Sequence, residues 1–346
     1  MIKHYLEHSV VDESKRRISH VFDIFDTVAV MFNGSLDSLA VLLLTQEVSP
    51  RTPVLAIYRD EEIVPECMVE YLQLFRGGGI QLDWYVVPYI SDMYVLGQVH
   101  TYKQWDPDRP SIRTPPSWAI EEHGGAFSET SFLALIGARY PGKIALLDGV
   151  RATEGIARYR SSVVKLNENY ITATSGVPDV LGVRPIFDWS RDDVLAYLSG
   201  REAPISSLYT YQLWAGDKQR ASVAPYGESA KSYEHLREVD PQLYERLIES
   251  LPALEAQALF GSQVDDEWLV DRYGSTIEGV KDWIEAHITH PRDKIAARMR
   301  FGAIANRCRK SPGLYPPSYV LRYFMRGAYS ENLPPFERAR PAGDPG

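Results

Sequence analysis

The residues at positions 33–38, five of them small or polar, have the character of a phosphate-binding loop. They lie between two apolar runs, 28–32 and 39–44. The first run is short and bounded, as a buried strand is, and the second is long enough to continue into a helix. A glycine-containing polar turn between strand and helix binds phosphate, because its backbone N–H groups are free and the helix N-terminus adds partial positive charge. The predicted phosphate-binding residues are Asn33, Gly34, Ser35, Leu36, Asp37 and Ser38.

This loop is not of the Walker type, since it has no Gly-Lys-Ser/Thr and its spacing differs. The alternative interpretation is a polar turn in which Asp37 or Ser38 merely caps the next helix. In the phosphate-binding interpretation, the amides of 34–38 and the serine hydroxyls hold the phosphates, and Asp37 orients the loop or approaches Mg²⁺, which prefers carboxylate and phosphate oxygens.

A second group of charged residues follows the apolar run 143–147. Arginine side chains fit phosphate or sulfate oxygens bidentately, so Arg151 and Arg158 are candidates to neutralise phosphates or to bind an anionic substrate. If 143–147 is a strand parallel to the first one and beside it, these arginines face the loop across the carboxyl edge of the sheet. Glu154 would then orient an arginine or accept a hydrogen bond from a hydroxyl. The alternative is a surface helix start with mixed charges.

The elements that must position these residues alternate along the chain. We predict helices at 12–26, from the loop to 47, at 65–75, at 128–139 and after Ser190, and strands at 28–32, 54–58, 82–87 and 143–147. The alternation indicates an α/β fold with a doubly wound parallel sheet, and ligands bind at the carboxyl edge of such sheets. Residues 100–125 have no period and are predicted to form a long loop.

The chain of 346 residues is long enough to bury a large core. We expect a nucleotide-binding domain at 1–200, a mostly helical region at 201–334 and a disordered tail at 335–346. No apolar run of 18 residues occurs, and the N-terminus lacks a signal-peptide pattern, so we expect no membrane contact and a cytoplasmic protein.

The two cysteines, Cys67 and Cys308, form neither a disulfide framework nor a CxxC motif. Cys67 is expected in the core. Cys308 lies among arginines, which would lower its pKa if they surround the thiol.

Charge is distributed unevenly late in the chain, although the net charge is −9. Residues 228–290 hold 14 acidic and 5 basic side chains, whereas residues 291–326 hold nine Lys/Arg and one Asp. Basic residues interleaved with tyrosines are typical of a surface that contacts nucleic acid. The interpretation that we favour is that the two stretches pair with each other inside the molecule.

The loop resembles the pyrophosphate-binding loop of ATP pyrophosphatases (PP-loop), Ser-Gly-Gly-x-Asp-Ser, with Gly34, Asp37 and Ser38 matching. The Gly149–Arg158 segment, Gly-Val-Arg-Ala-x-Glu followed by Arg, is similar to the arginine motif of the phosphoadenosine-phosphosulfate (PAPS) reductase family. Residues 184–197 resemble a third segment of that family. The chain most resembles a phage and bacterial subgroup of PAPS reductase-like proteins that are sometimes encoded beside ParB-like partners.

The resemblance implies an adenine nucleotide alpha-hydrolase-like fold with a helical C-terminal extension. It implies that the chain binds ATP with Mg²⁺ and cleaves the α–β phosphate bond, so that an unknown acceptor is adenylated. The resemblance implies catalytic roles for Asp37, Ser38, Arg151 and Arg158. It also implies nucleotide contacts for Gly149 and Glu154. The resemblance places Arg158, Arg220 and Tyr226 on the acceptor side.

One departure from the family bears on function. The reductases use a cysteine in a Glu-Cys-Gly-x-His context, which this chain lacks, so thiol-dependent PAPS reduction and an iron–sulfur cluster are not expected. Three alternatives stay open: a nucleotide-binding regulatory protein without turnover, a PAPS-binding enzyme that uses an external thiol, and a nucleic-acid-modifying enzyme that contacts its substrate through residues 291–326.

Overall fold

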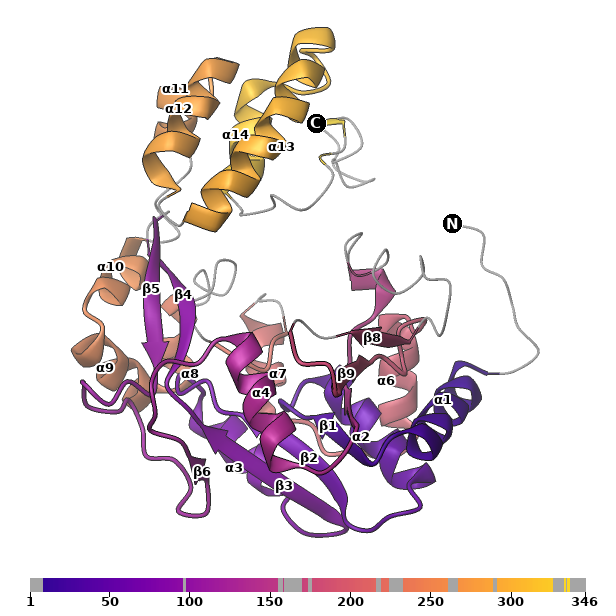
Figure 1. Cartoon of the computed structure of the whole chain (residues 1–346). Helices are drawn as coiled ribbons and strands as arrows, with labels where there is room; N and C mark the ends of the chain where they lie inside the picture. Colours follow the sequence, from indigo (N-terminus) through magenta and orange to yellow (C-terminus); the bar gives the residue numbers. More distant parts are fainter. Residues whose placement is uncertain are drawn as a thin grey trace. The chain divides into compact units, whose positions relative to one another are not determined.

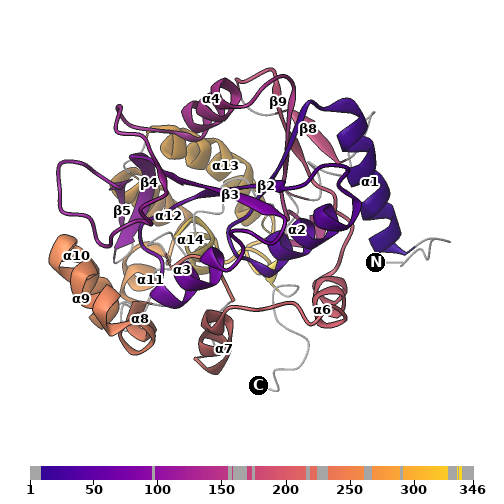
Figure 2. The ribbon, with the colours of Figure 1, turned by 90° about the horizontal axis from the view of Figure 1, so that it is seen from below.

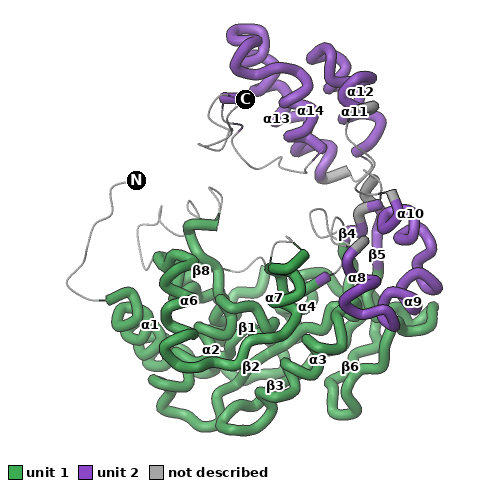
Figure 3. Tube along the Cα trace, turned by 180° about the vertical axis from the view of Figure 1, so that it is seen from behind, with its two compact units in different colours: residues 1–91, 103–222 green, residues 92–102, 223–346 purple. Residues whose placement is uncertain are grey.

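The computed structural model divides into two compact units, residues 1–91 with 103–222 and residues 92–102 with 223–346 (Figure 3). Each unit is described by itself. The structure describes residues 9–95, 98–154, 158, 170–173, 176–215, 219–223, 233–260, 267–288, 291–325, 333 and 335–336. The predicted tail at 335–346 therefore lies almost wholly outside the described residues.

A seven-stranded sheet in the order β6-β3-β2-β1-β7-β9-β8 forms the centre of the first unit (Figure 1). All neighbouring strands are parallel except β8 and β9, which are antiparallel. The α/β class with a mostly parallel, doubly wound sheet is thereby confirmed. The strands are β1 Thr27–Met31, β2 Val54–Arg59, β3 Ile80–Val86, β6 Ile120–Glu121, β7 Ile144–Leu147, β8 Ile171–Ala173 and β9 Val180–Val183.

Strands β1 and β7 are direct neighbours, with Val30 opposite Leu147. Because both run in the same direction, the residues that follow them leave the sheet at the same edge. The register thus brings the loop after β1 close to the segment that begins at Asp148.

Helices cover both faces of this sheet. Figure 2 shows α4 on one side of β2 and β3, with α2 and α3 on the other. On the α4 side, Phe132, Leu133 and Ile136 share a core cluster with Ala29 and other strand residues. The helices of this unit are α1 Val10–Ile24, α2 Leu36–Val48, α3 Glu66–Gln73, α4 Glu129–Arg139, α6 Arg191–Ser199 and α7 Ser207–Trp214, with a 3-10 turn η1 at Ala152–Glu154.

The helix starts follow from capping residues. Ser35 caps α2 by accepting a hydrogen bond from the Ser38 amide. Ser190 and Asp193 form a reciprocal capping box at the start of α6, as their spacing predicts.

The second unit contains most of a two-stranded sheet, β4 Tyr89–Val95 and β5 Gln98–Gln104, followed by helices. Trp283, Val320 and Phe324 belong to a separate hydrophobic core. No helix among the described residues is long and apolar enough to cross a membrane. The helices are α8 Tyr233–Val239, α9 Pro241–Ser250, α10 Ala253–Phe260, α11 Glu267–Tyr273, α12 Ile277–His287, α13 Pro291–Lys310 and α14 Pro317–Met325.

The prediction of an unstructured loop over 100–125 was wrong at both ends. Strand β5 extends to Gln104, and β6 at Ile120–Glu121 pairs in parallel with β3. The end of β5 carries the polar run His100 to Gln104, and β6 is only two residues long, so neither gives a hydrophobic period.

Candidate functional site

The loop after β1 turns sharply at Gly34. This residue has a φ of +78°, and a β-carbon here would lie 2.8 Å from the sulfur of Met68. The left-handed backbone and the close sulfur both favour glycine. The Gly34 carbonyl accepts a hydrogen bond of 2.9 Å from the hydroxyl of Tyr209 on α7.

Side chains of the loop bind one another. The Asn33 side-chain oxygen accepts hydrogen bonds from the Ser35 amide at 3.1 Å and from the Ser38 hydroxyl at 2.9 Å. The Ser35 hydroxyl oxygen accepts from the Ser38 amide at 3.1 Å. Asn33 therefore fixes the loop from the position where the PP-loop motif has its first serine.

Two of the predicted phosphate-binding amides, those of Ser35 and Ser38, are thus already bonded within the loop. The amides of Gly34, Leu36 and Asp37 have no acceptor in the part of the chain that the structure describes. Those of Leu36 and Asp37 belong to the first turn of α2, where backbone N–H groups lack intrahelical partners. These amides remain as the anion donors of the loop.

The segment after β7 meets this helix start. A β-carbon added to Gly149 would lie 2.7 Å from the Asp37 carbonyl carbon and 2.8 Å from the Ser38 nitrogen. Arg151 donates to both carboxylate oxygens of Asp37, with Nε–Oδ1 at 2.7 Å and Nη2–Oδ2 at 3.4 Å. The structure therefore joins the two sequence motifs by a largely buried ion pair.

The ion pair continues into a short chain of charges. Glu154 lies 3.6 Å from Arg151 and also pairs with Arg158. Glu154 orients the arginines here, as its charge and spacing predict. Arg158 is an exposed residue whose chain neighbours lie outside the described residues.

Burial raises the pKa of two acids at this edge. Desolvation raises the pKa of Asp37, although Arg151 opposes the shift by hydrogen bonding and by its charge. Desolvation raises the pKa of Asp148 to about 6, against the Val150 amide and the charges of Arg184 and Arg158, which lower it. Acids with perturbed pKa values beside several arginines are a common feature of functional sites.

Two residues beyond the predicted set belong to this region. Arg191, the first residue of α6, lies close enough for its charge to lower the pKa of Asp37, and it donates a hydrogen bond to the Gln219 side chain. Tyr209 contacts Gly34 directly. Both residues lie on helices that are distant from the loop in the sequence. The sequence pattern around them indicates a helix but gives no sign of a contact with the loop.

The predicted acceptor residues are only partly placed. The Arg220 amide donates to Gln212 of α7 at 2.8 Å, and Gln212 donates back to the Arg220 carbonyl at 2.9 Å. Arg220 is thereby held beside the helix that carries Tyr209. Tyr226 lies outside the described residues.

Buried acids follow β2 at the same edge of the sheet. Asp60 and Glu62 have no exposed surface. Asp60 pairs with Arg113 and accepts from the Trp84 ring nitrogen at 2.7 Å, while Glu62 pairs with Arg109. These contacts fix the segment after β5, and they give Asp60 and Glu62 a structural role.

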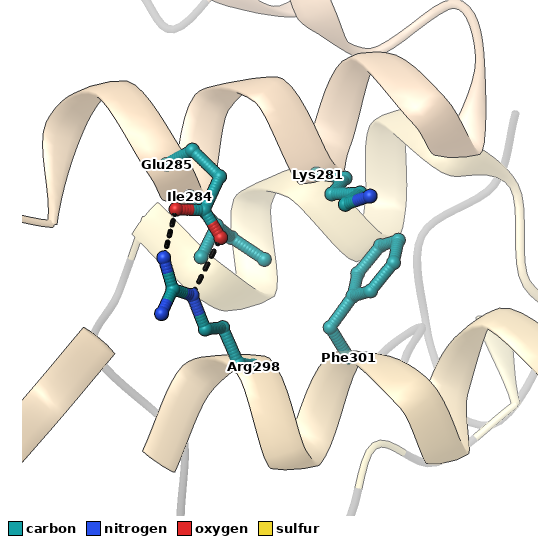
Figure 4. Close-up of a pocket in the computed structure, with 5 residues that line it drawn as sticks. All are labelled: Lys281, Ile284, Glu285, Arg298 and Phe301. Carbon is teal, nitrogen blue, oxygen red and sulfur yellow. Dashed lines mark hydrogen bonds and ion pairs between the residues drawn. The ribbon is translucent and has the colours of Figure 1, made fainter. Parts of the chain in front are cut away.

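The remaining chemical candidates are weaker. A pocket of about 350 Å³ between α12 and α13 is lined by residues drawn in Figure 4, but its acid Glu285 is already bonded to Arg298. Cys308 is buried, and burial raises its pKa, contrary to the expectation from its arginine neighbours. A catalytic thiolate at Cys308 is therefore disfavoured.

The donor set at the loop does not fit a protein-held Mg²⁺. Asp37 is engaged by Arg151. Across the described part of the chain, no group of three or more His, Cys, Asp or Glu residues is placed to hold a metal ion. An Mg²⁺ ion at this site would have to be held mainly by phosphate oxygens.

We compared the sequence with models of known protein families. Residues 138–247 match the family model described as phosphoadenosine phosphosulfate reductase domain. The resemblance to the PAPS reductase family is confirmed. The match to this PAPS reductase domain includes Gly149, Arg151 and Tyr209, while the loop at 33–38 precedes it.

Solved structures give weaker likenesses. FMN adenylyltransferase from Candida glabrata is 14% identical over 58% of this chain and 58% of its own, with a TM-score of 0.39. PAPS reductase from Candida auris is 13% identical over 64% of this chain and 97% of its own, with a TM-score of 0.34. The U34-tRNA thiolase NcsA from Methanococcus maripaludis is 15% identical over 73% of this chain and 82% of its own, with a TM-score of 0.32.

This chain therefore spans little more than half the length of the first of these proteins. Likenesses of this degree do not define its activity. No curated protein matches the chain significantly.

Proposed function

We propose that this PAPS reductase-like chain binds ATP and cleaves its α–β phosphate bond, so that an acceptor is adenylated. The observation that supports this most strongly is the contact between Arg151 and Asp37 at the start of α2. It brings an arginine of the family-matched segment to free backbone amides, and amides with an adjacent arginine are a favourable setting for a polyphosphate.

In this proposal each group has a defined part. The Leu36 and Asp37 amides, at the positive end of α2, hold the β and γ phosphates that leave as pyrophosphate. Arg151 moves part of its hydrogen bonding from Asp37 to the phosphates. Arg158 and Arg191 add positive charge, while Asp37 keeps Arg151 oriented.

The proposed reaction needs no covalent bond between the protein and the nucleotide. An acceptor oxygen attacks the α-phosphorus, the bond from that phosphorus to the bridging oxygen breaks, and pyrophosphate leaves with the electron pair. The acceptor hydroxyl loses its proton to solvent. Positioning and charge stabilisation account for the rate, as in other phosphoryl-type transfers.

Calorimetry with ATP, PAPS and inorganic pyrophosphate tests the binding half of the proposal. We expect ATP to bind, and Arg151→Ala to weaken it by about tenfold or more, because a charge-assisted hydrogen-bonding group is lost. Arg16→Ala is the matched control, since the Arg16 side chain is 77% exposed on α1 and pairs with its helix neighbour Glu13. Equal affinities for the wild type and Arg151→Ala would contradict the proposal.

Calorimetry together with product analysis separates the alternatives. A preference for PAPS over ATP would favour a sulfonucleotide enzyme with an external thiol. Tight ATP binding with no product would favour a regulatory protein, for which the altered residues Asn33, Ser35 and Leu36 are the sequence support.

Nucleic-acid contact through residues 291–326 is a second proposal, favoured by one observation. Arg307, Arg309 and Lys310 at the end of α13 are exposed, and they have no acidic partner among the described residues. By contrast, Arg298 and Lys294 pair with Glu285 of the acidic stretch. Binding of DNA or RNA by the three free cations would weaken with salt. A ParB-like protein partner stays a prediction of the resemblance.

A further inference from the structure

The peptide unit between Gly34 and Ser35 is held at both of its polar ends. Its carbonyl oxygen, which belongs to Gly34, accepts the Tyr209 hydroxyl at 2.9 Å. Its N–H group, which belongs to Ser35, donates to the Asn33 side chain at 3.1 Å. One partner comes from the loop and the other from α7, which lies more than 170 residues away in the sequence.

A flip of this peptide plane would change ψ of Gly34 and φ of Ser35. Gly34 has no side chain and accepts the change in ψ, whereas Ser35 at its present φ of −67° is in a favoured region that a flip would leave. At the Gly34 end, the two hydrogen bonds are therefore what hold the peptide. A flipped peptide would exchange the directions of its carbonyl oxygen and its N–H group. At a phosphate-binding loop, an exposed carbonyl oxygen would repel the anion that the neighbouring amides attract.

Tyr209 is well suited to prevent the flip. Its side chain is buried, with 4% of the residue exposed, and burial raises the pKa of its hydroxyl, so it stays a neutral hydrogen-bond donor. The helix that carries it is anchored separately, because the Tyr71 hydroxyl donates to the Pro204 carbonyl at 3.0 Å, just before α7. A rigidly placed donor holds a carbonyl more effectively than a mobile one.

We propose that Tyr209 and Asn33 are positioning residues that lock the Gly34–Ser35 peptide in the orientation that accepts phosphate. Tyr209 has no direct role in the reaction: it acts through the loop backbone. The proposal deepens the function proposed above and rests on it, because the lock matters only if the loop binds a phosphate chain.

Binding of inorganic pyrophosphate and ATP, measured by calorimetry, tests the lock. Tyr209→Phe should weaken both by roughly three- to tenfold, the effect of one hydrogen bond. Tyr211→Phe is the matched control, since it removes the same hydroxyl from the exposed face of α7 and leaves the Gly34 carbonyl bonded. This control should bind within about twofold of the wild type.

A double-mutant cycle separates positioning from general destabilisation. Asn33→Ala and Tyr209→Phe act on one peptide, so the double variant should lose less affinity than the product of the single losses. Asn33 is exposed, so Asn33→Ala tests the lock even if Tyr209→Phe does not fold.

Three outcomes would overturn the lock. They are wild-type affinity in both Tyr209→Phe and Asn33→Ala, an equal loss in Tyr211→Phe, and full additivity in the cycle. If the wild type bound neither ATP nor pyrophosphate, the proposed function itself would fail, and the lock with it.

Discussion

At Gly149 the segment after β7 packs directly against the loop after β1. The direction in which its side chain would point is filled by the Asp37 carbonyl carbon, 2.7 Å from an added β-carbon. The obstacle is backbone, which cannot rotate out of the way as a side chain can. Any residue larger than glycine must push the two segments apart, and with them Arg151 from Asp37.

Gly149→Ala should therefore impair the site. We expect a loss of about 1–3 kcal/mol in the free energy of unfolding from overpacking, together with weaker ATP binding. Gly124→Ala is the control, because a β-carbon there meets nothing within 4 Å. Urea unfolding and calorimetry measure the two effects, and equal behaviour of the two variants would refute the close contact.

Asp148 gives the site a dependence on pH. Its pKa of about 6 in the folded chain lies above the ordinary value of 3.8. Between these values, the unfolded chain releases a proton that the folded chain retains, so this residue lowers the stability as the pH rises from about 4 to about 6. Its unfavourable contribution is complete above that range and absent below it.

Asp148→Asn should accordingly be more stable than the wild type at pH 7.5 and no more stable near pH 4. An asparagine retains an oxygen that can accept from the Val150 amide. Urea unfolding of both proteins across this range measures the difference. A difference that does not grow between pH 4 and pH 6 would count against the buried carboxyl.

At the residue scale, the sequence predicted which residues belong to the site better than it predicted their hydrogen-bond partners. Asp37, Ser38 and Arg151 could be selected because their types and spacing resemble phosphate-binding motifs, and the structure brings them together. Their hydrogen-bond partners could not be predicted, because Tyr209 and Arg191 lie on helices whose position depends on packing over the whole sheet.

At the scale of elements, buried ion pairs attach the segment after β5 to the end of β2. Arg113 bonds Asp60, and Arg109 bonds Glu62, in a region where both acids are fully buried. Breaking a buried pair leaves an uncompensated charge, whereas losing an exposed pair costs little. These pairs explain how a segment without hydrophobic period is held in place.

Arg113→Met should lower the free energy of unfolding by about 3–5 kcal/mol, because Asp60 is left charged and buried. Arg16→Met, which breaks the exposed pair with Glu13, should cost no more than about 1 kcal/mol. Chemical denaturation of the two variants measures both. Similar small losses would mean that the buried pair does not stabilise this segment.

Element positions were predictable wherever the pattern was strong. The strands β1, β2, β3 and β7 and the helices α1, α2, α3 and α4 lie within about two residues of their predicted bounds. Strands β4, β5, β6, β8 and β9 were not predicted. Strand β5 ends in a polar run and β6 has two residues, so neither bears a periodic signal. Their formation depends on neighbours that are distant in the sequence.

At the scale of the whole molecule, charge is segregated along the chain. The net charge is −9, yet α13 ends with three exposed cations, Arg307, Arg309 and Lys310. Cations near a helix C-terminus also stabilise its dipole.

Reversing Arg307, Arg309 and Lys310 to glutamate should abolish salt-sensitive binding of DNA or RNA while leaving the affinity for ATP unchanged within about twofold. Fluorescence anisotropy with labelled nucleic acid at several salt concentrations, alongside ATP calorimetry, measures both. Nucleic-acid binding that survives the reversal would exclude this helix end as the contact.

Product analysis with ATP tests the central claim most directly. Wild-type protein, Asp37→Asn and the exposed control Asp108→Asn, whose side chain is 88% exposed, are each incubated with ATP and Mg²⁺, and the phosphorus products are identified by NMR. We predict pyrophosphate from the wild type and from Asp108→Asn, and at least tenfold less from Asp37→Asn, in which Arg151 loses its charged partner. ADP with inorganic phosphate, or bound ATP that yields no pyrophosphate, would contradict cleavage between the α and β phosphates.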